Sequence, residues 1–203
     1  MNSKTSDIQR EFAEIYGEQL TVNNERLRAI TKLVEHFIKI YNEKKKIIIS
    51  RAPARVNLMG RHIDHQGGYV NTIAIDKEIL LAASQRKDNV INIKNVNSTQ
   101  FPARELKPNT LLDIATFSDW EIFVRSGQVQ NLNKSIPDDW SMYILAAFYR
   151  LQLHFPDVRL QGIDCIFSGM YPLDQDYHLA VPLESLFRKH SLCLTIFTSQ
   201  RIC

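Results

Sequence analysis

The chain has 203 residues, with 25 Lys and Arg against 22 Asp and Glu, 44% hydrophobic residues and only seven Gly and seven Pro. This composition excludes collagen-like and intrinsically disordered proteins. A net charge of +3 is too weak to indicate nucleic-acid binding. No apolar run reaches the roughly 18 residues that a membrane helix needs. We therefore expect one or two globular domains with neither a nucleic-acid nor a membrane partner.

The three cysteines and the N-terminal sequence point to a reducing compartment. Cys165, Cys193 and Cys203 are odd in number and widely spaced, and they form no Cys-x-x-Cys pair. This pattern favours reduced thiols over a disulfide framework or a thiolate zinc site. Residues 1–7 lack the apolar stretch of a signal peptide. A cytoplasmic location is expected.

Helical periodicity dominates the first 41 residues. Residues 6–18 carry apolar side chains at helical spacing and predict a short amphipathic helix. A longer helix is predicted behind Asn24, a possible N-cap. Its apolar residues recur every three or four positions, which requires one buried face. They are Leu27, Ile30, Leu33, Val34, Phe37, Ile38 and Tyr41.

Strand patterns follow after three consecutive lysines. Residues 47–50 are mostly β-branched and predict a buried strand that Pro53 ends. Further strands are predicted at residues 69–75 and 78–84. A turn at residues 87–89 leads into another strand at residues 90–93.

The second half of the chain has one strong helical pattern. Residues 97–135 give no clear prediction. Pro137, Asp138 and Asp139 form a favourable helix start, and residues 160–167 predict a last strand. The helix between them, to about His154, has one apolar face that consists of Trp140, Tyr143, Ile144, Ala147, Phe148 and Leu151.

Polar side chains are concentrated between the predicted strands that end at Pro53 and begin at residue 69. Such loops usually carry function, because a sheet holds them while their side chains stay accessible. Arg55 and Arg61 suit a phosphate or carboxylate, and Asp64 suits hydroxyl groups. A solvated turn with capping side chains remains open. His62, Asp64 and His65 are also possible metal ligands, but adjacent loop residues without a fourth ligand are more often hydrogen-bonding groups.

Residues 51–68 read Arg-Ala-Pro-Ala-Arg-Val-Asn-Leu-Met-Gly-Arg-His-Ile-Asp-His-Gln-Gly-Gly. This order resembles the sugar-binding signature of galactokinases, which are members of the GHMP small-molecule kinase family. A helix shortly before the signature and a Trp-x-x-Tyr pattern at Trp140 and Tyr143 agree with the resemblance, which covers about residues 10–173. It implies an α+β fold that corresponds to the N-terminal half of a GHMP kinase, ribosomal S5 domain 2-like, with helices packed on a mixed sheet.

The resemblance also implies an activity and roles for single residues. The family transfers the γ-phosphoryl group of ATP, with Mg²⁺, to a hydroxyl of a small sugar. Arg55 is implied to be catalytic, beside the reacting hydroxyl and the transferred phosphoryl group. His62 and Asp64 are implied to bond the sugar hydroxyls, and two glycines let the backbone close around the sugar. The implied substrate-binding residues are Arg61, His62, Asp64, Gly67 and Gly68.

Three positions depart from the family pattern. Arg61 stands where Glu is usual, which replaces an acceptor by a donor-only cation. His65 stands where Tyr is usual, and Ala54 replaces a Gly and so restricts the backbone. The sequence therefore does not identify the sugar. One hypothesis is a sugar that bears a carboxylate or lacks one hydroxyl.

A second family motif, a Pro-x-x-x-Gly-Leu-Ser-Ser-Ser phosphate loop, is replaced by Asp-Gln-Asp-Tyr-His-Leu-Ala-Val-Pro at residues 174–182. Codons for these residues, read in a shifted frame, permit Pro-Gly-Leu-Ser-Ser-Ser-Ser-Ala. We interpret residues 1–173 as an incomplete galactokinase-like domain and residues 174–203 as an out-of-frame tail, although an accidental match is the alternative. The expected function is that of a sugar kinase whose chain is inactive alone, and a non-catalytic sugar-binding or sensing protein is the alternative. No residue is assigned as catalytic base, and the oligomeric state stays open.

Overall fold

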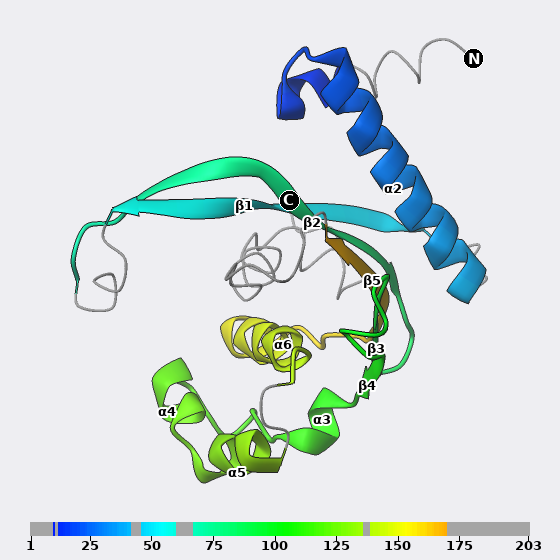
Figure 1. The fold of residues 1–203 in the computed structure, drawn as a ribbon. Coiled ribbons are helices and arrows are strands. Elements are labelled where there is room, and N and C mark those ends of the chain that lie inside the picture. The colour runs from blue at the N-terminus through cyan, green and yellow to red at the C-terminus, as the bar shows by residue number, and fades with distance from the viewer. Residues whose placement is uncertain (1–9, 11, 42–45, 60–66, 136–138, 170–203) are drawn as a thin grey trace.

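A computed structural model describes residues 10, 12–41, 46–59, 67–135 and 139–169. Its centre is a five-stranded sheet with the strand order β1-β2-β5-β3-β4 (Figure 1). The β3–β5 pair is parallel, and the other three pairs are antiparallel. The strands are β1 (Ile48–Met59), β2 (Asn71–Gln85), β3 (Ile91–Asn95), β4 (Arg104–Leu106) and β5 (Ile163–Gly169). This mixed sheet with packed helices confirms the expected α+β fold.

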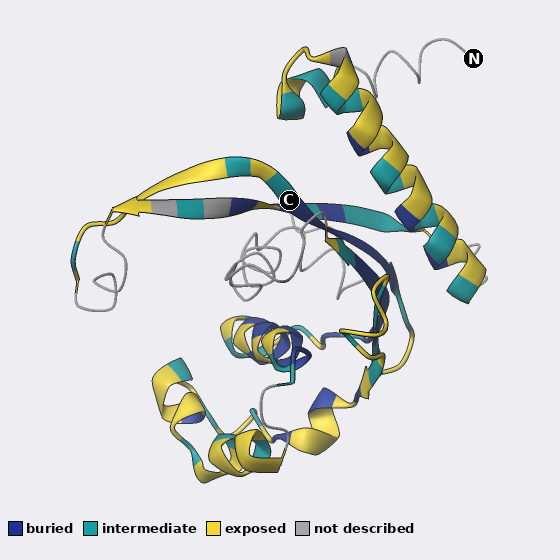
Figure 2. Cartoon of the chain, in the orientation of Figure 1, coloured by how far each residue is buried: buried dark blue, intermediate teal, exposed yellow. Residues whose placement is uncertain are grey.

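The long helix α2 (Leu20–Tyr41) covers one face of the sheet (Figure 1). Leu33 and Phe37 are buried against Leu80, Ala82 and Ile166. Buried and exposed positions alternate along α2 in Figure 2, as the apolar periodicity requires. Leu27 and Ile38 are exposed, however, so their placement on the buried face was wrong. The helix begins four residues before the predicted cap. A short helical segment at residues 12–16 precedes it, which confirms the first predicted helix within the described residues.

The main core lies on the other face of the sheet, against α6 (Met142–His154). Side chains alternate along a strand, so Ile79, Leu81 and Ala83 of β2 point away from α2 and join this core. Ile144 and Phe148 of α6 pack in the same cluster. Both predicted faces of the 78–84 strand are therefore buried, which explains its continuous apolar run.

The first three strand predictions were wrong in their limits. Pro53 does not end the first strand, because β1 continues to Met59. β1 is an edge strand with a neighbour on one side only, and edge strands tolerate a residue without an N–H. The strands predicted at 69–75 and 78–84 are a single strand, β2, with a register shift between them.

The region without a clear pattern contains β4 and three short helices. These are α3 (Pro108–Leu111), α4 (Trp120–Val124) and α5 (Gly127–Ser135). The last predicted helix, α6, starts at Met142, after Asp139 accepts a hydrogen bond of 2.9 Å from the Ser141 N–H. Tyr143 is 46% exposed, so its placement on the buried face was wrong. Residues 137 and 138 lie outside the described residues.

Gly162, directly before β5, lies against the backbone of Val90. A Cβ at this position would lie 2.0 Å from the carbonyl oxygen of Val90. The Gly162 N–H donates a 2.6 Å hydrogen bond to the Asp88 carbonyl. The turn between β2 and β3 therefore sits directly on the start of β5.

We expect Gly162→Ala to lower the free energy of unfolding by about 2 kcal/mol or more, because the methyl group must displace backbone atoms. Urea unfolding measures this loss. Gly127→Ala is the matched control, since nothing lies within 4 Å of a Cβ at Gly127, and it should be neutral or slightly stabilising. Equal stabilities of the two variants would contradict the close approach.

Candidate functional site

The signature begins inside the sheet and continues into a projecting hairpin. We call residues 54–59 of β1 and 71–77 of β2 the signature arm, which extends beyond the other strands (Figure 1). Arg55 lies in β1 opposite Ala74, and Asn57 lies opposite Thr72. The predicted loop is therefore a strand up to Met59, and strand pairing sets the backbone at Arg55.

The other implied sugar-binding residues are in the segment that links β1 to β2. Arg61, His62 and Asp64 lie outside the described residues. Gly67 is described and has φ of +76°, a left-handed conformation that favours glycine. Gly68 follows it in an irregular segment. The positive φ at Gly67 explains the need for glycine there, whereas the roles of all five residues remain predictions.

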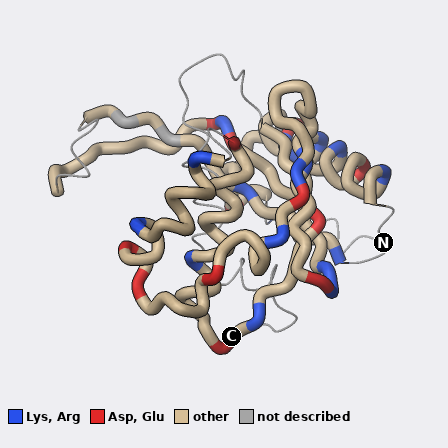
Figure 3. The backbone as a smooth tube through the Cα atoms, turned by 90° about the horizontal axis from the view of Figure 1, so that it is seen from below, with Lys and Arg blue, Asp and Glu red and all other residues tan. Residues whose placement is uncertain are grey.

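The described part of the signature arm beyond Arg55 is uncharged as far as Asp76 (Figure 3). Its outer portion is also largely exposed (Figure 2). The large hydrophobic residues exposed on the arm and next to it are Leu58, Met59, Tyr69, Val70 and Ile73. The charged groups of the signature are thus confined to the base of the arm and to its linking segment.

The base of the arm contains a buried ionic cluster that the sequence did not reveal. Glu78 of β2 is only 2% exposed, and its carboxylate lies 3.0 Å from Nη1 of Arg51. The Tyr16 hydroxyl donates to the same carboxylate. Burial and the nearby Glu78 charge raise the pKa of Tyr16, so its proton stays on the hydroxyl. The available signal was a single carboxylate, Glu78, directly before an apolar run.

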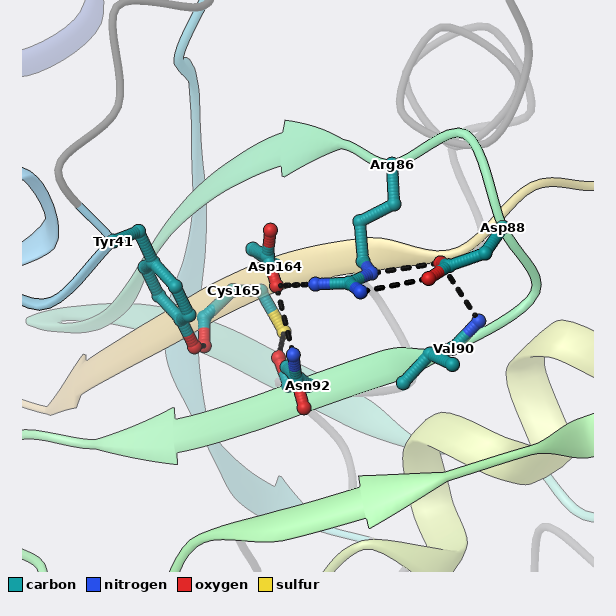
Figure 4. Close-up of polar contacts among 7 residues, drawn as sticks. All are labelled: Tyr41, Arg86, Asp88, Val90, Asn92, Asp164 and Cys165. Atoms are coloured by element: carbon teal, nitrogen blue, oxygen red, sulfur yellow. Dashed lines mark hydrogen bonds and ion pairs between the residues drawn. The ribbon is translucent and has the colours of Figure 1, made fainter.

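A second polar cluster lies at the other end of β2 (Figure 4). Arg86 donates from Nε and Nη2 to the two carboxylate oxygens of Asp88, at 2.8 and 2.7 Å. Its Nη1 donates over 2.6 Å to Oδ1 of buried Asp164. Asn92 donates to the same oxygen over 3.0 Å. These paired groups hold the β2–β3 turn against β5, which is a structural role.

The pKa values of this second cluster follow from its pairing. The hydrogen bond from Arg86 lowers the pKa of Asp88 to about 2. The hydrogen bonds that Arg86 donates to Asp88 and Asp164 raise the pKa of Arg86 despite its partial burial. Burial raises the pKa of the Cys165 thiol, with a further contribution from Asp164. Cys165 is therefore protonated, buried and unreactive.

The described residues include neither a metal-binding group nor a membrane span. These residues contain no group of three or more His, Cys, Asp or Glu side chains that could hold a metal ion. Among the described helices, none has the length and apolarity required to cross a membrane.

Known proteins share the signature of this chain. Residues 35–85, which include α2 residues, β1 and β2, match the galactokinase galactose-binding signature. A galactokinase from Dictyostelium discoideum is 32% identical over 145 residues, which are 70% of this chain and 25% of that protein. A galactokinase from Clostridium tetani is 41% identical over 68 residues, which are 34% of this chain and 17% of that protein. The chain is related to galactokinases.

Solved structures support the fold of this galactokinase-related chain. The crystal structure of Lactococcus lactis galactokinase complexed with galactose superposes with a TM-score of 0.59 and 20% sequence identity. The match covers 86% of this chain and 39% of the Lactococcus protein. Mevalonate kinase from Methanococcus jannaschii matches 78% of this chain and 43% of its own, with a TM-score of 0.51 and 13% identity. The galactokinase-related chain thus spans less than half of the length of each of these proteins.

The Arg86–Asp88 pair predicts a loss of stability in acid. The folded-state pKa of Asp88 is about 2 against an ordinary value of 3.8, so its contribution is present above the ordinary value and is lost as the pH falls through about 2. Because Asp88 is half-exposed, we expect less than about 1 kcal/mol from it. Urea unfolding between about pH 5 and pH 2 should depend less on pH in Asp88→Asn. An unchanged pH dependence would contradict the pairing.

Proposed function

We propose that this chain forms the sugar-binding part of a galactokinase-like sugar kinase. The observation that carries the proposal is the match of residues 35–85 to the galactose-binding signature. The fold supports it, because β1 and β2 present this signature on an arm whose base is held by buried groups. The reaction proposed for the kinase is transfer of the γ-phosphoryl group of ATP to a sugar hydroxyl.

The proposed roles follow the chemistry of the side chains. Arg55 supplies a cation beside the reacting hydroxyl and the transferred phosphoryl group. Asp64 accepts hydrogen bonds from ring hydroxyls, and His62 donates or accepts them. Gly67 and Gly68 let the backbone approach the sugar. Such contacts place a hydroxyl in one orientation, which is the main source of catalysis in phosphoryl transfer.

Arg61 sets the proposed choice of sugar. The galactokinase from Lactococcus lactis was crystallised with galactose, but a guanidinium at residue 61 has only donors to offer where Glu is usual. A carboxylate on the sugar pairs well with this cation. We therefore propose a sugar that bears a carboxylate, or one that lacks the hydroxyl that Glu would bind.

The chain's own residues do not fit a Mg-ATP site. Residues 174–182 contain neither glycine nor serine, so their sequence lacks the glycine and the serine hydroxyl groups that a phosphate loop of this family uses. We assign no step through ATP or Mg²⁺ to this chain, and we propose that it is inactive as a kinase alone. Retention of the sugar signature beside this altered segment favours the second candidate, a non-catalytic sugar-binding or sensing protein in the cytoplasm.

A sugar panel tests the proposed binding site. We expect galacturonate to raise the melting temperature of the chain by several degrees at about 100 times its dissociation constant, and galactose to raise it less. Arg61→Glu should reverse this preference, because the new carboxylate accepts from a hydroxyl and repels an acidic sugar. Differential scanning fluorimetry measures both. A response of the unaltered chain to galactose alone would contradict the role of Arg61.

Sugar phosphorylation tests the proposed lack of kinase activity. The purified chain, incubated with Mg-ATP and the sugar that stabilises it most, should give no sugar phosphate above background by mass spectrometry. Sustained turnover would overturn the proposal. Sequencing the gene through codon 173 tests the cause: a shifted frame that encodes Gly-Leu-Ser-Ser supports the out-of-frame tail, and an intact frame supports the sugar-binding protein.

A further inference from the structure

The buried cluster at the base of the signature arm joins four separate parts of the chain. We call Tyr16, Arg26, Arg51 and Glu78 the Glu78 cluster. Tyr16 belongs to the helical segment at residues 12–16, Arg26 to α2 and Arg51 to β1, while Glu78 lies in β2. All three partners approach one carboxylate, so this group fixes the base of the arm to both helical segments.

The carboxylate of Glu78 is fully engaged. Oε1 lies 3.1 Å from the Tyr16 hydroxyl and 3.5 Å from Nη1 of Arg26. Oε2 lies 3.2 Å from the Tyr16 hydroxyl and 3.0 Å from Nη1 of Arg51. Glu78 and Arg26 are both buried. Hydrogen bonds to ionised groups in such surroundings are strong and directional.

Arg51 and Tyr16 also pack against each other. The guanidinium carbon of Arg51 lies 4.6 Å from the centre of the Tyr16 ring, within the range of a cation–π contact. Phe12 supports the same ring, with 5.5 Å between the two ring centres. The side chain of Arg51, which precedes Arg55 by four residues in the signature, is thus held in a fixed orientation.

The cluster sits at a β-bulge. Pro53 pairs with Glu78, but Arg55 pairs with Ala74, so three residues of β2 oppose Ala54 alone. A bulge disrupts the ladder and bends the strand. Arg26 donates from Nη2 to the carbonyl oxygen of Asp76 within the bulged segment. One guanidinium therefore supports the bulged backbone and contacts the neighbouring carboxylate of Glu78.

We propose that Glu78 is a positioning residue that sets the direction of the signature arm and thereby the affinity of the proposed sugar site. Arg55 is paired immediately after the bulge, so any change of the bulge moves the backbone that carries it. Glu78 acts through Arg26 and Arg51 and is not itself placed in the sugar site. The effect on sugar affinity rests on the proposed function, whereas the effect on the arm does not.

A charged cluster suits this task better than apolar packing. Apolar contacts are non-directional, whereas a carboxylate with two arginines and a tyrosine accepts few geometries. Removing one partner of a buried pair leaves the other charge uncompensated. Glu78→Gln keeps the size of the side chain but replaces one acceptor oxygen by an NH₂ donor that faces arginine donors.

The test compares Glu78→Gln with Asp164→Asn in the full chain. Asp164 is a matched control, because it is also a buried carboxylate paired with an arginine, at 2.6 Å. It lies beside Ser84, near the other end of β2. In hydrogen–deuterium exchange, Glu78→Gln should speed exchange of the arm peptides 54–59 and 71–77 by about tenfold. Asp164→Asn should instead affect the peptides around residues 86–92 and 163–169.

Sugar affinity gives the second readout. By isothermal titration with galacturonate and galactose, Glu78→Gln should weaken the better ligand about tenfold, and Asp164→Asn should leave its affinity unchanged. Unaltered exchange of the arm in Glu78→Gln, or equal losses of affinity in both variants, would overturn the proposal. If the unaltered chain binds neither sugar, the proposed ligands are wrong, while the exchange experiment still decides the role of Glu78. If Glu78→Gln does not fold, Tyr16→Phe replaces it, because this change removes only one donor.

Discussion

Strand β2 is the constraint on which the rest of the structure depends. It pairs with β1 on one edge from Ile79 to Ala83 and with β5 on the other edge from Ile79 to Gln85. Its two faces are buried under α2 and α6. Beyond Glu78, toward Asn71, the same strand pairs with β1 only and becomes exposed. One strand therefore contributes both the centre of the core and the projecting arm.

The change between these two halves occurs at the Glu78 cluster. On the core side, position is set by close packing of apolar side chains. On the arm side, few packed neighbours are available, so the direction of the hairpin depends on the bulge and on the ionic contacts that support it. This arrangement gives the proposed sugar-binding segment a firm base while its outer part stays accessible, as binding segments require.

Hydrophobic periodicity correctly predicted the features of the fold that depend on burial alone. The α2 face with Leu33 and Phe37 was predicted correctly because one helix face packs on one sheet face. Tyr143 was wrongly assigned to the buried face. The three-residue spacing of Trp140 and Tyr143 also fits the start of a helix, and α6 begins only at Met142. The short helices α3, α4 and α5 gave no signal, because segments of four to nine residues contain too few turns for a period.

The sequence predicted the chemistry of the candidate site but not the spatial arrangement of its residues. The order of residues 51–68 indicated a sugar site, which the family comparison supports. Pro53 misled the strand assignment, because the sequence does not show that β1 is an edge strand. The contacts of Tyr16 and Arg26 with Glu78 span 62 and 52 positions of the sequence, a separation at which side-chain pairing cannot be read from local patterns.

The signature arm and its linking segment are proposed to bind a sugar. The most direct measurement is a ¹H–¹⁵N correlation spectrum of the isotopically labelled chain, recorded during titration with galacturonate and with galactose. The proposed site predicts saturable shifts of the amide signals from residues 54–77, with β3 and β4 unaffected. Saturable shifts confined to other parts of the chain, or no shifts with either sugar, would contradict it.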